Sequence, residues 1–160
     1  MAVHTGRLKA VWKNKYISFP VKVKLYESLV MSTLLYSAEL WPLTVTEKKK
    51  LEAAHHRFQR RLLGITWRDK IRNQEIRRQT RLKTLDLIIK QRRLRWLGQV
   101  LRMDDGRIPK QAISWEMGAT SRGPGRPRKN WNDIIQKDLK SIGVAWEDAE
   151  HFIFDREAWQ

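Results

Sequence analysis

The chain has 160 residues, which is enough for one domain with a real hydrophobic core. Its 33 lysines and arginines against 17 acidic residues give a net charge of +16, a self-repulsion that a bound polyanion relieves. Cysteine is absent, which excludes disulfides, thiolate zinc sites and a cysteine nucleophile, and eight tryptophans favour a packed structure over disorder. Without a transmembrane run or a signal-peptide pattern, we expect an intracellular protein, nuclear or cytoplasmic, with no membrane partner.

The first two elements of the chain are predicted to be helices. A short basic helix is expected over residues 5–13, and a longer helix over residues 21–36. In the longer helix, apolar side chains recur at helical spacing, at Val23, Tyr26, Val30 and Thr33. Trp41 precedes a proline, and a residue in that position avoids helical backbone. The second helix is therefore expected to end before Trp41.

A third helix is predicted over residues 47–63. Thr44 stands three residues before Glu47, the spacing of a capping box, and Gly64 is a helix stop. The expected apolar stripe consists of Leu51, Ala54, Phe58 and Leu62.

The middle of the chain predicts three further helices after a loop over residues 65–72. A short polar helix is expected to be capped by Asn73. Thr84 is expected to cap the longest helix, residues 85–103, which the turn sequence Asp-Asp-Gly then ends. A shorter helix over 108–117 carries a proline in its first turn, where proline is tolerated.

The last part of the chain predicts a linker and a pair of helices. Residues 118–129 are rich in glycine, proline and arginine, as linkers are, and Gly143 separates helices expected over 130–142 and 145–159. Because no alternating strand pattern is found, the predicted fold class is all-α: a bundle-like helical region, further helices, the Gly/Pro-rich basic linker and the helix pair. The predicted regions are residues 1–65, 66–117, 118–129 and 130–160.

Basic residues concentrate in the middle of the chain. Residues 57–110 hold 17 basic and 5 acidic residues, whereas residues 130–160 hold 7 acidic and 3 basic ones. On the two longest predicted helices, arginines are expected opposite the apolar arc, and arginine matches phosphate oxygens well. The candidate nucleic-acid-binding residues of these two helices are Arg57, Arg60, Arg61, Arg92, Arg95 and Arg102, and Arg68 in the predicted loop is a further candidate. The alternative interpretation is a charged face that only meets solvent.

The linker contains a second candidate contact. Its sequence Gly-Arg-Pro-Arg-Lys matches the core of an AT-hook, in which a thin extended strand places arginines in a narrow minor groove. Arg126, Arg128 and Lys129 are the residues concerned. The alternatives are a flexible basic linker and a nuclear-import patch.

No complete catalytic site is expected in the chain. Asp104 and Asp105 are interpreted as a helix stop rather than a metal-binding pair, and Asp138 lacks the upstream partners of a nuclease motif. His55 and His56 are adjacent, so they do not share a helix face as zinc ligands would. We therefore expect no catalytic residue, no metal and no cofactor.

Several blocks of the sequence resemble, in order, segments of non-LTR (LINE-like) retrotransposon reverse transcriptases. The blocks are LLYSAELW (34–41), RRLLGITWRD (60–69), RLRWLGQVLRM (93–103), GRPRKNW (125–131), WEDA (146–149) and the closing residues 155–159. The chain departs from many of these proteins in having no cysteine before the second block, so a zinc-knuckle role is not expected.

The resemblance implies that residues 1–65 form the polymerase thumb, which grips the primer–template duplex. The remainder would be the basic C-terminal region, which helps to hold RNA and target DNA. The palm, with its catalytic aspartates, and the endonuclease domain are missing, so we expect a non-enzymatic fragment that binds RNA, DNA or a hybrid. Leu29, Leu34 and Tyr36 would then form an apolar patch toward an absent palm or fingers.

Two alternatives to this interpretation stay open at the level of the sequence. One is a free-standing AT-hook-like chromatin module, which would prefer A·T-rich duplex. The other is a non-functional retroelement remnant.

Overall fold

The computed structural model describes residues 8–117 and 130–154. All regular elements in these two stretches are helices, and no strand is found in them, which confirms the predicted all-α fold class. None of the helices described is long and apolar enough to cross a membrane.

The described residues form two compact units. Unit 1 comprises residues 8–36 and 45–87, and unit 2 comprises residues 37–44 together with 88–154 as far as they are described. The chain thus passes from unit 1 to unit 2 at residue 37 and returns to unit 1 at residue 45. It passes to unit 2 a second time within helix α7 (Leu85–Leu101). The four regions predicted from composition and charge stay a prediction.

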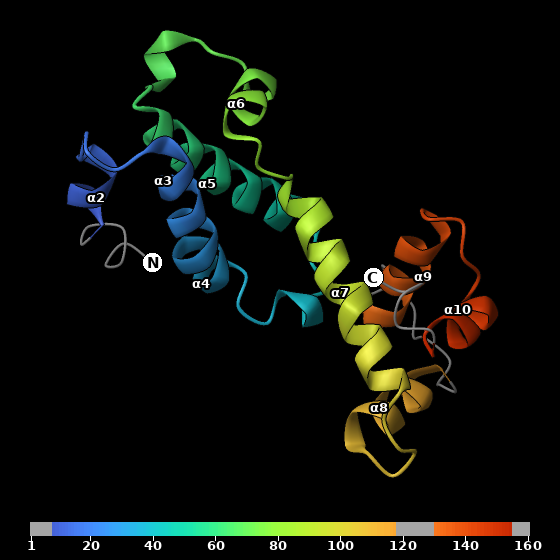
Figure 1. Ribbon diagram of the computed structural model, residues 1–160. Coiled ribbons are helices and arrows are strands. Elements are labelled where there is room, and N and C mark those ends of the chain that lie inside the picture. The colour runs from blue at the N-terminus through green and yellow to red at the C-terminus, as the bar shows by residue number, and fades with distance from the viewer. Residues whose placement is uncertain (1–7, 118–129, 155–160) are drawn as a thin grey trace. The chain divides into compact units, whose positions relative to one another are not determined.

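Unit 1 is built around helix α5, with α3 and α6 packed on it (Figure 1). Besides the start of α7, its elements are α2 (Lys9–Lys13), α3 (Phe19–Leu25), the π-helix η1 (Tyr26–Met31), α4 (Ser32–Leu34), α5 (Val45–Leu63), the 3-10 helix η3 (Trp67–Asp69) and α6 (Asn73–Thr80).

The helix predicted over residues 21–36 is present as α3, η1 and α4, which follow one another directly. The wider turns of a π-helix shift the positions after it relative to an uninterrupted α-helix. Tyr26 is buried as predicted, but Thr33 is exposed, and Met31 and Leu34 are buried instead. Of the four predicted apolar positions, Tyr26 alone is buried, Val23 and Val30 are half-buried, and the prediction for Thr33, after the π-helix, was wrong.

Helix α5 begins at Val45, two residues before the predicted start, and ends at Leu63 as predicted. The predicted apolar stripe on it is wrong in position. Leu62 is buried, but the other three stripe residues are only half-buried. The remaining buried residues of α5 are polar: His55, His56 and Gln59.

The helices after α5 follow the prediction with small shifts. The predicted loop contains the short helix η3, and Asn73 is the first residue of α6 rather than its cap. Thr84 caps α7 as predicted, because its Oγ1 accepts a hydrogen bond from Leu87 N at 3.4 Å. With 17 residues, α7 is shorter than the 19-residue α5, so the prediction that it is the longest helix was wrong.

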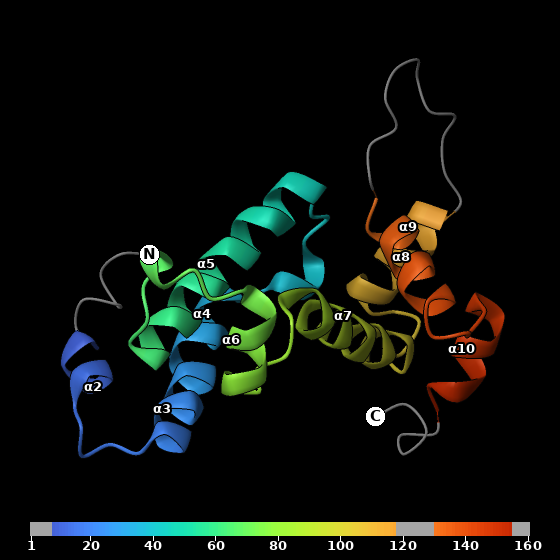
Figure 2. The same cartoon turned by 90° about the horizontal axis from the view of Figure 1, so that it is seen from above.

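Unit 2 has its own hydrophobic core, to which four helices contribute. Figure 2 shows the ribbons of these helices. Its elements are η2 (Ala38–Leu40), most of α7, α8 (Ile108–Met117), α9 (Trp131–Lys140) and α10 (Trp146–Phe152). The buried core residues are Leu97, Val100, Ile113, Ile135, Leu139, Ala149 and Ile153.

The C-terminal helix pair is confirmed within the described residues. Gly143 lies between α9 and α10 with a φ of 77°, a left-handed conformation that suits glycine. The Nε1 of Trp131 donates a hydrogen bond to the carbonyl oxygen of Glu39 at 2.7 Å. This bond ties the segment 37–44 to α9.

Candidate nucleic-acid interface

Unit 1 contains an open cavity of about 1220 Å³ whose walls are strongly basic. Seven of its fifteen lining residues are lysine or arginine, and none of the lining residues is acidic. The basic ones are Lys9, Lys13, Lys15, Lys22, Arg57, Arg60 and Arg61. A concave surface lined with one sign of charge focuses its field on a ligand of the opposite sign, so this cavity favours a polyanion.

The cations of the cavity are mostly not neutralised by the protein itself. Among the described residues, no acidic side chain forms an ion pair with any of the seven. Lys22 Nζ instead donates a hydrogen bond to the carbonyl oxygen of Trp12 at 3.0 Å, which joins α3 to the buried side of α2. The guanidinium of Arg61 lies 5.9 Å from the ring centre of Phe58. These charges are therefore left for an outside partner.

Helix α5 supplies one wall of the cavity, because one of its faces is exposed and basic while the opposite face is buried. Successive helical residues are rotated by about 100°, so Arg57 and Arg61 share a face that His55 and Gln59 do not. Arg57 and Arg61 are exposed, whereas His55 and Gln59 are fully buried. The buried face anchors the helix in unit 1 and leaves the arginine face toward the cavity.

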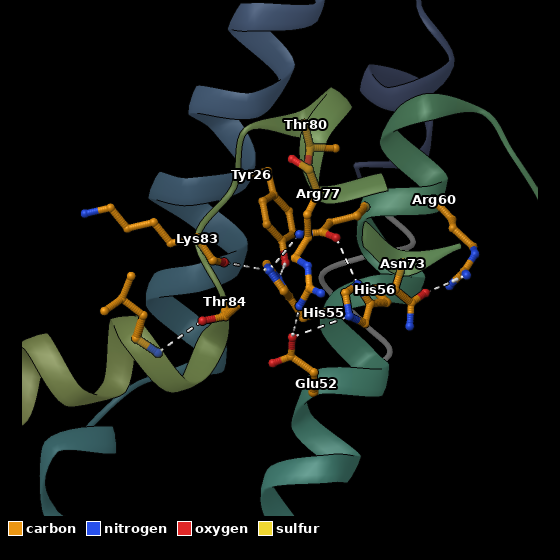
Figure 3. Close-up of polar contacts among 12 residues, drawn as sticks. Tyr26, Glu52, His55, His56, Arg60, Asn73, Arg77, Thr80, Lys83 and Thr84 are labelled. Carbon is orange, nitrogen blue, oxygen red and sulfur yellow. Dashed lines mark hydrogen bonds and ion pairs between the residues drawn. The ribbon is translucent and has the colours of Figure 1, made fainter. Parts of the chain in front are cut away.

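The buried face of α5 is held by a polar network rather than by apolar packing alone (Figure 3). Tyr26 Oη lies 2.7 Å from His55 Nδ1, and Gln59 Nε2 lies 2.8 Å from His55 Nε2. Gln59 Oε1 is in turn 3.0 Å from His56 Nδ1. The network links η1 to α5, so that a helix with three buried polar side chains stays satisfied inside the protein.

The network continues from α5 to α6 through a carboxylate. Glu52 Oε1 lies 3.4 Å from His56 Nε2 and 3.6 Å from Arg77 NH1. Figure 3 shows these side chains pointing toward one another. The network therefore fixes α5 to both η1 and α6.

Burial sets the charge state at the centre of the network. Burial lowers the pKa of His55 to about 4, although its hydrogen bond to the carbonyl oxygen of Lys83 acts in the opposite direction. Burial also raises the pKa of Tyr26, with smaller contributions from the nearby charges of Glu52 and Glu27. Both groups are neutral near pH 7, as a buried pair without a counter-ion should be.

The C-terminus of α5 turns the chain along the cavity. Gly64 N donates to the carbonyl oxygen of Arg61 at 3.3 Å, and Ile65 N donates to that of Arg60 at 3.0 Å. With Gly64 at a φ of 70°, this is a Schellman motif, for which glycine is the preferred residue. Gly64 therefore ends α5, as the sequence predicted.

The motif leads directly into η3, which carries Trp67 and Arg68. The carboxylate of Asp69 accepts hydrogen bonds from Thr66 N and, at 3.0 Å, from Thr66 Oγ1. These bonds lower the pKa of Asp69, the backbone N–H contributing most. Trp67 lines the cavity yet is 78% exposed, and the Arg68 guanidinium lies 5.7 Å from its ring centre.

The candidate arginines of the sequence fall into different environments. In unit 1, Arg57, Arg60 and Arg61 line the cavity, and Arg68 lies beside it on η3. Arg60 is partly engaged by the protein itself, since its NH2 donates to Ile71 O at 3.2 Å and to Asn73 Oδ1 at 2.7 Å. Arg57 and Arg61 are therefore the arginines best placed to meet a ligand.

The candidates on α7 (Arg92 and Arg95) and just after its end (Arg102) belong to unit 2. Arg95 is exposed, Arg92 is half-buried, and Arg102 is half-buried with its NH1 donating to the carbonyl oxygen of Ile153 at 2.7 Å. Arg126, Arg128 and Lys129, the AT-hook-like residues, lie outside the described residues.

Reasoning from the sequence missed the lysine side of the cavity. Lys9 and Lys13 are four residues apart on a helix, so the spacing already placed them on one face. The sequence offered no signal that α2 would lie across from the C-terminal half of α5. The tertiary structure alone brings Lys9 and Lys13 to the same cavity as Arg57 and Arg61.

Two of the aspartates to which no catalytic role was assigned, Asp105 and Asp138, form ion pairs within the protein. Asp105 Oδ1 lies 2.7 Å from Lys110 Nζ, and this contact lowers the pKa of Asp105. Asp138 forms an ion pair with Arg93. Within the stretches that the structure describes, no three histidine or acidic side chains form a group able to hold a metal ion.

Comparison with known proteins finds a distant similarity to one transposon-derived protein. Over 123 residues, 74% of this chain, it is 28% identical to an uncharacterized transposon-derived protein of Caenorhabditis elegans. The aligned region covers 44% of that relative, so the chain spans less than half of its length. No protein-family model matches the chain. No solved structure matches it either.

Proposed function

We propose that this chain binds nucleic acid through backbone phosphates, as a non-catalytic part of a transposon-encoded reverse transcriptase of the non-LTR type. The observation that carries the proposal is the cavity of unit 1, with seven basic side chains and no acidic one on its walls. A nucleic acid carries a phosphate charge at each nucleotide, and lysines and arginines that neutralise these charges release the condensed counterions and so favour binding. Contacts of this kind position a protein on its ligand without reading sequence.

Two further observations support the proposal. The similarity to a transposon-derived protein fits the sequence blocks that resemble reverse transcriptases of mobile elements. Leu29, on η1, and Tyr36, just after α4, are 47% and 77% exposed, which fits a surface that would face the palm or fingers of a longer polymerase. Leu34, which was expected in the same patch, is buried.

The experiment that tests the proposal is a binding titration of the whole chain across a salt series. Labelled duplex DNA, RNA–DNA hybrid and single strands are used in parallel. Each neutralised phosphate should contribute a slope of about −0.9 for duplex in a plot of log K against log salt. A slope of magnitude about 3 or more, with similar affinity for unrelated sequences, supports phosphate binding. A folded chain that binds none of these ligands at low salt contradicts it.

A further inference from the structure

Trp67 is placed where an aromatic side chain gains little from the protein's own core. It lies on η3 at the edge of the basic cavity and is 78% exposed. Large aromatic rings normally contribute to stability by burying their area. An indole that is 78% exposed and lines a cavity with seven cations therefore leaves ring surface open to another ring.

The backbone that carries Trp67 is ordered before any ligand arrives. The Schellman motif at Gly64 fixes the end of α5, and the hydrogen bonds between Thr66 and Asp69 fix the turn that follows. A ring that is held in position loses less conformational entropy on binding than a ring on a flexible segment. The Arg68 guanidinium, 5.7 Å from the ring centre, adds positive charge at the same place.

The size of the cavity argues for a polymeric ligand. Its volume of 1220 Å³ exceeds the range of about 300–1,000 Å³ that is typical of small-molecule pockets. Its cations come from α2, the following loop, α3 and α5, so they are spread along the walls rather than gathered at one point. A string of phosphates meets such a distribution better than one phosphate group does.

From these observations we propose that the cavity is a site for an unpaired stretch of polynucleotide. One base stacks on Trp67, while neighbouring phosphates lie against Lys13, Arg57 and Arg61. A duplex offers phosphates but keeps its base faces stacked inside, whereas a single strand offers both groups. Aromatic stacking platforms combined with a basic groove are the general means of holding single strands. This inference rests on the proposed function and adds to it the class of nucleic acid that this cavity takes.

The test uses the full chain with Trp67→Ala, Trp67→Phe and the control Tyr36→Ala. Tyr36 is an equally exposed aromatic residue of unit 1, 77% against 78%, and does not line the cavity. The ligands are a labelled single strand, the same strand made of abasic sites, and a blunt duplex, each as DNA, with a single-stranded RNA in parallel. The abasic strand keeps the phosphates and removes the rings. Far-UV circular dichroism checks that each variant is folded.

The expected result is specific to ligands that carry unpaired bases. Trp67→Ala should weaken single-strand binding by about five- to 150-fold, the range that corresponds to the loss of one stacked base. Trp67→Phe should retain most of the affinity, and Tyr36→Ala all of it. Binding of the abasic strand and of the duplex should change by less than about twofold in Trp67→Ala, because the phosphate contacts remain. The relative effect on RNA and DNA strands tells which of the two the site prefers.

Two outcomes overturn the inference and keep it apart from the proposed function. If Trp67→Ala weakens abasic and normal strands equally, Trp67 only shapes the cavity and no base stacks on it. If the wild type binds duplex and Trp67→Ala leaves single-strand binding unchanged, the proposed phosphate binding is supported and the single-strand site is contradicted. Failure of the wild type to bind any of the ligands removes both.

Discussion

The Arg93 guanidinium is buried in unit 2 and forms an ion pair with the carboxylate of Asp138. The two side chains are 2% and 16% exposed. Arg93 falls on the apolar face of α7, and helical periodicity alone does not explain why a charged residue lies there. Its carboxylate partner on α9 supplies the explanation, since a buried guanidinium requires a nearby counter-charge. The pair also joins two helices that build the core of unit 2.

Removing the carboxylate should destabilise unit 2 strongly. In Asp138→Asn the buried guanidinium of Arg93 loses its counter-charge, and we expect a loss of about 3–5 kcal/mol in the free energy of unfolding. Urea denaturation followed by circular dichroism measures it. The control is Asp148→Asn on the exposed start of α10, where about 0.3–1 kcal/mol is expected from the helix dipole. Equal losses in the two variants would show that the ion pair stabilises the protein no more than an exposed carboxylate at a helix start does.

Unit 1 should lose stability as the pH falls from 6.5 toward 4. The pKa of His55 is about 4 in the folded protein, against the ordinary histidine value of 6.5 in an unfolded chain, so the unfolded state binds the extra proton first. The stabilisation is complete above pH 6.5 and declines on acidification, by up to about 3 kcal/mol.

Chemical denaturation at a series of pH values tests this prediction. His55→Gln should be less stable at neutral pH but should lose less on acidification, because the titrating group is gone. His151→Gln, which alters an exposed histidine of unit 2, should keep the wild-type profile. The assignment to His55 is wrong if the His55→Gln profile is as steep as that of the wild type.

The hydrogen bond between Trp131 and Glu39 should hold the 37–44 segment in unit 2. Trp131→Phe keeps a ring against Trp96, 4.9 Å away between ring centres, but removes the N–H donor. We expect a loss of about 1–2 kcal/mol, since the carbonyl of Glu39 is left without its partner. Trp67→Phe, at an exposed position, should change stability by less than about 0.5 kcal/mol. Thermal unfolding of the two variants under identical conditions compares them.

The helical elements themselves were predictable from local signals. Gly64 ended α5 because only a residue tolerant of positive φ completes a Schellman motif there. Thr84 capped α7 through its hydroxyl, and the proline after Ile108 lay in the first turn of α8. Each of these features depends on a few neighbouring residues, which is why the sequence shows them.

The buried faces were less predictable, because they depend on partners far along the chain. His55, His56 and Gln59 look like surface residues until Tyr26 and Glu52 satisfy them. The apolar stripe predicted on α5 was therefore displaced by a polar network that hydrophobic periodicity does not detect. The π-helix η1 similarly altered the phase of the apolar positions after Tyr26.

The candidate interface was predicted in part. The arginine face of α5 followed from helical geometry, and Arg57 and Arg61 are indeed exposed beside the cavity. The lysines of α2 joined it only through the tertiary structure. The AT-hook-like prediction for Arg126, Arg128 and Lys129 falls on residues outside the described stretches and stays a prediction.

A binding site in the cavity is tested most directly by comparing two double variants with the same change in net charge. Arg57→Glu with Arg61→Glu reverses two cavity cations, whereas Lys24→Glu with Lys140→Glu reverses two exposed lysines that do not line the cavity. Binding of a labelled single strand and a duplex is measured across a salt series. We predict that the cavity variant binds at least about tenfold more weakly, with a salt slope reduced by about 2, and that the control stays close to the wild type. Equal losses of affinity in the two variants would mean that only the overall charge attracts nucleic acid, and would contradict a binding site in the cavity.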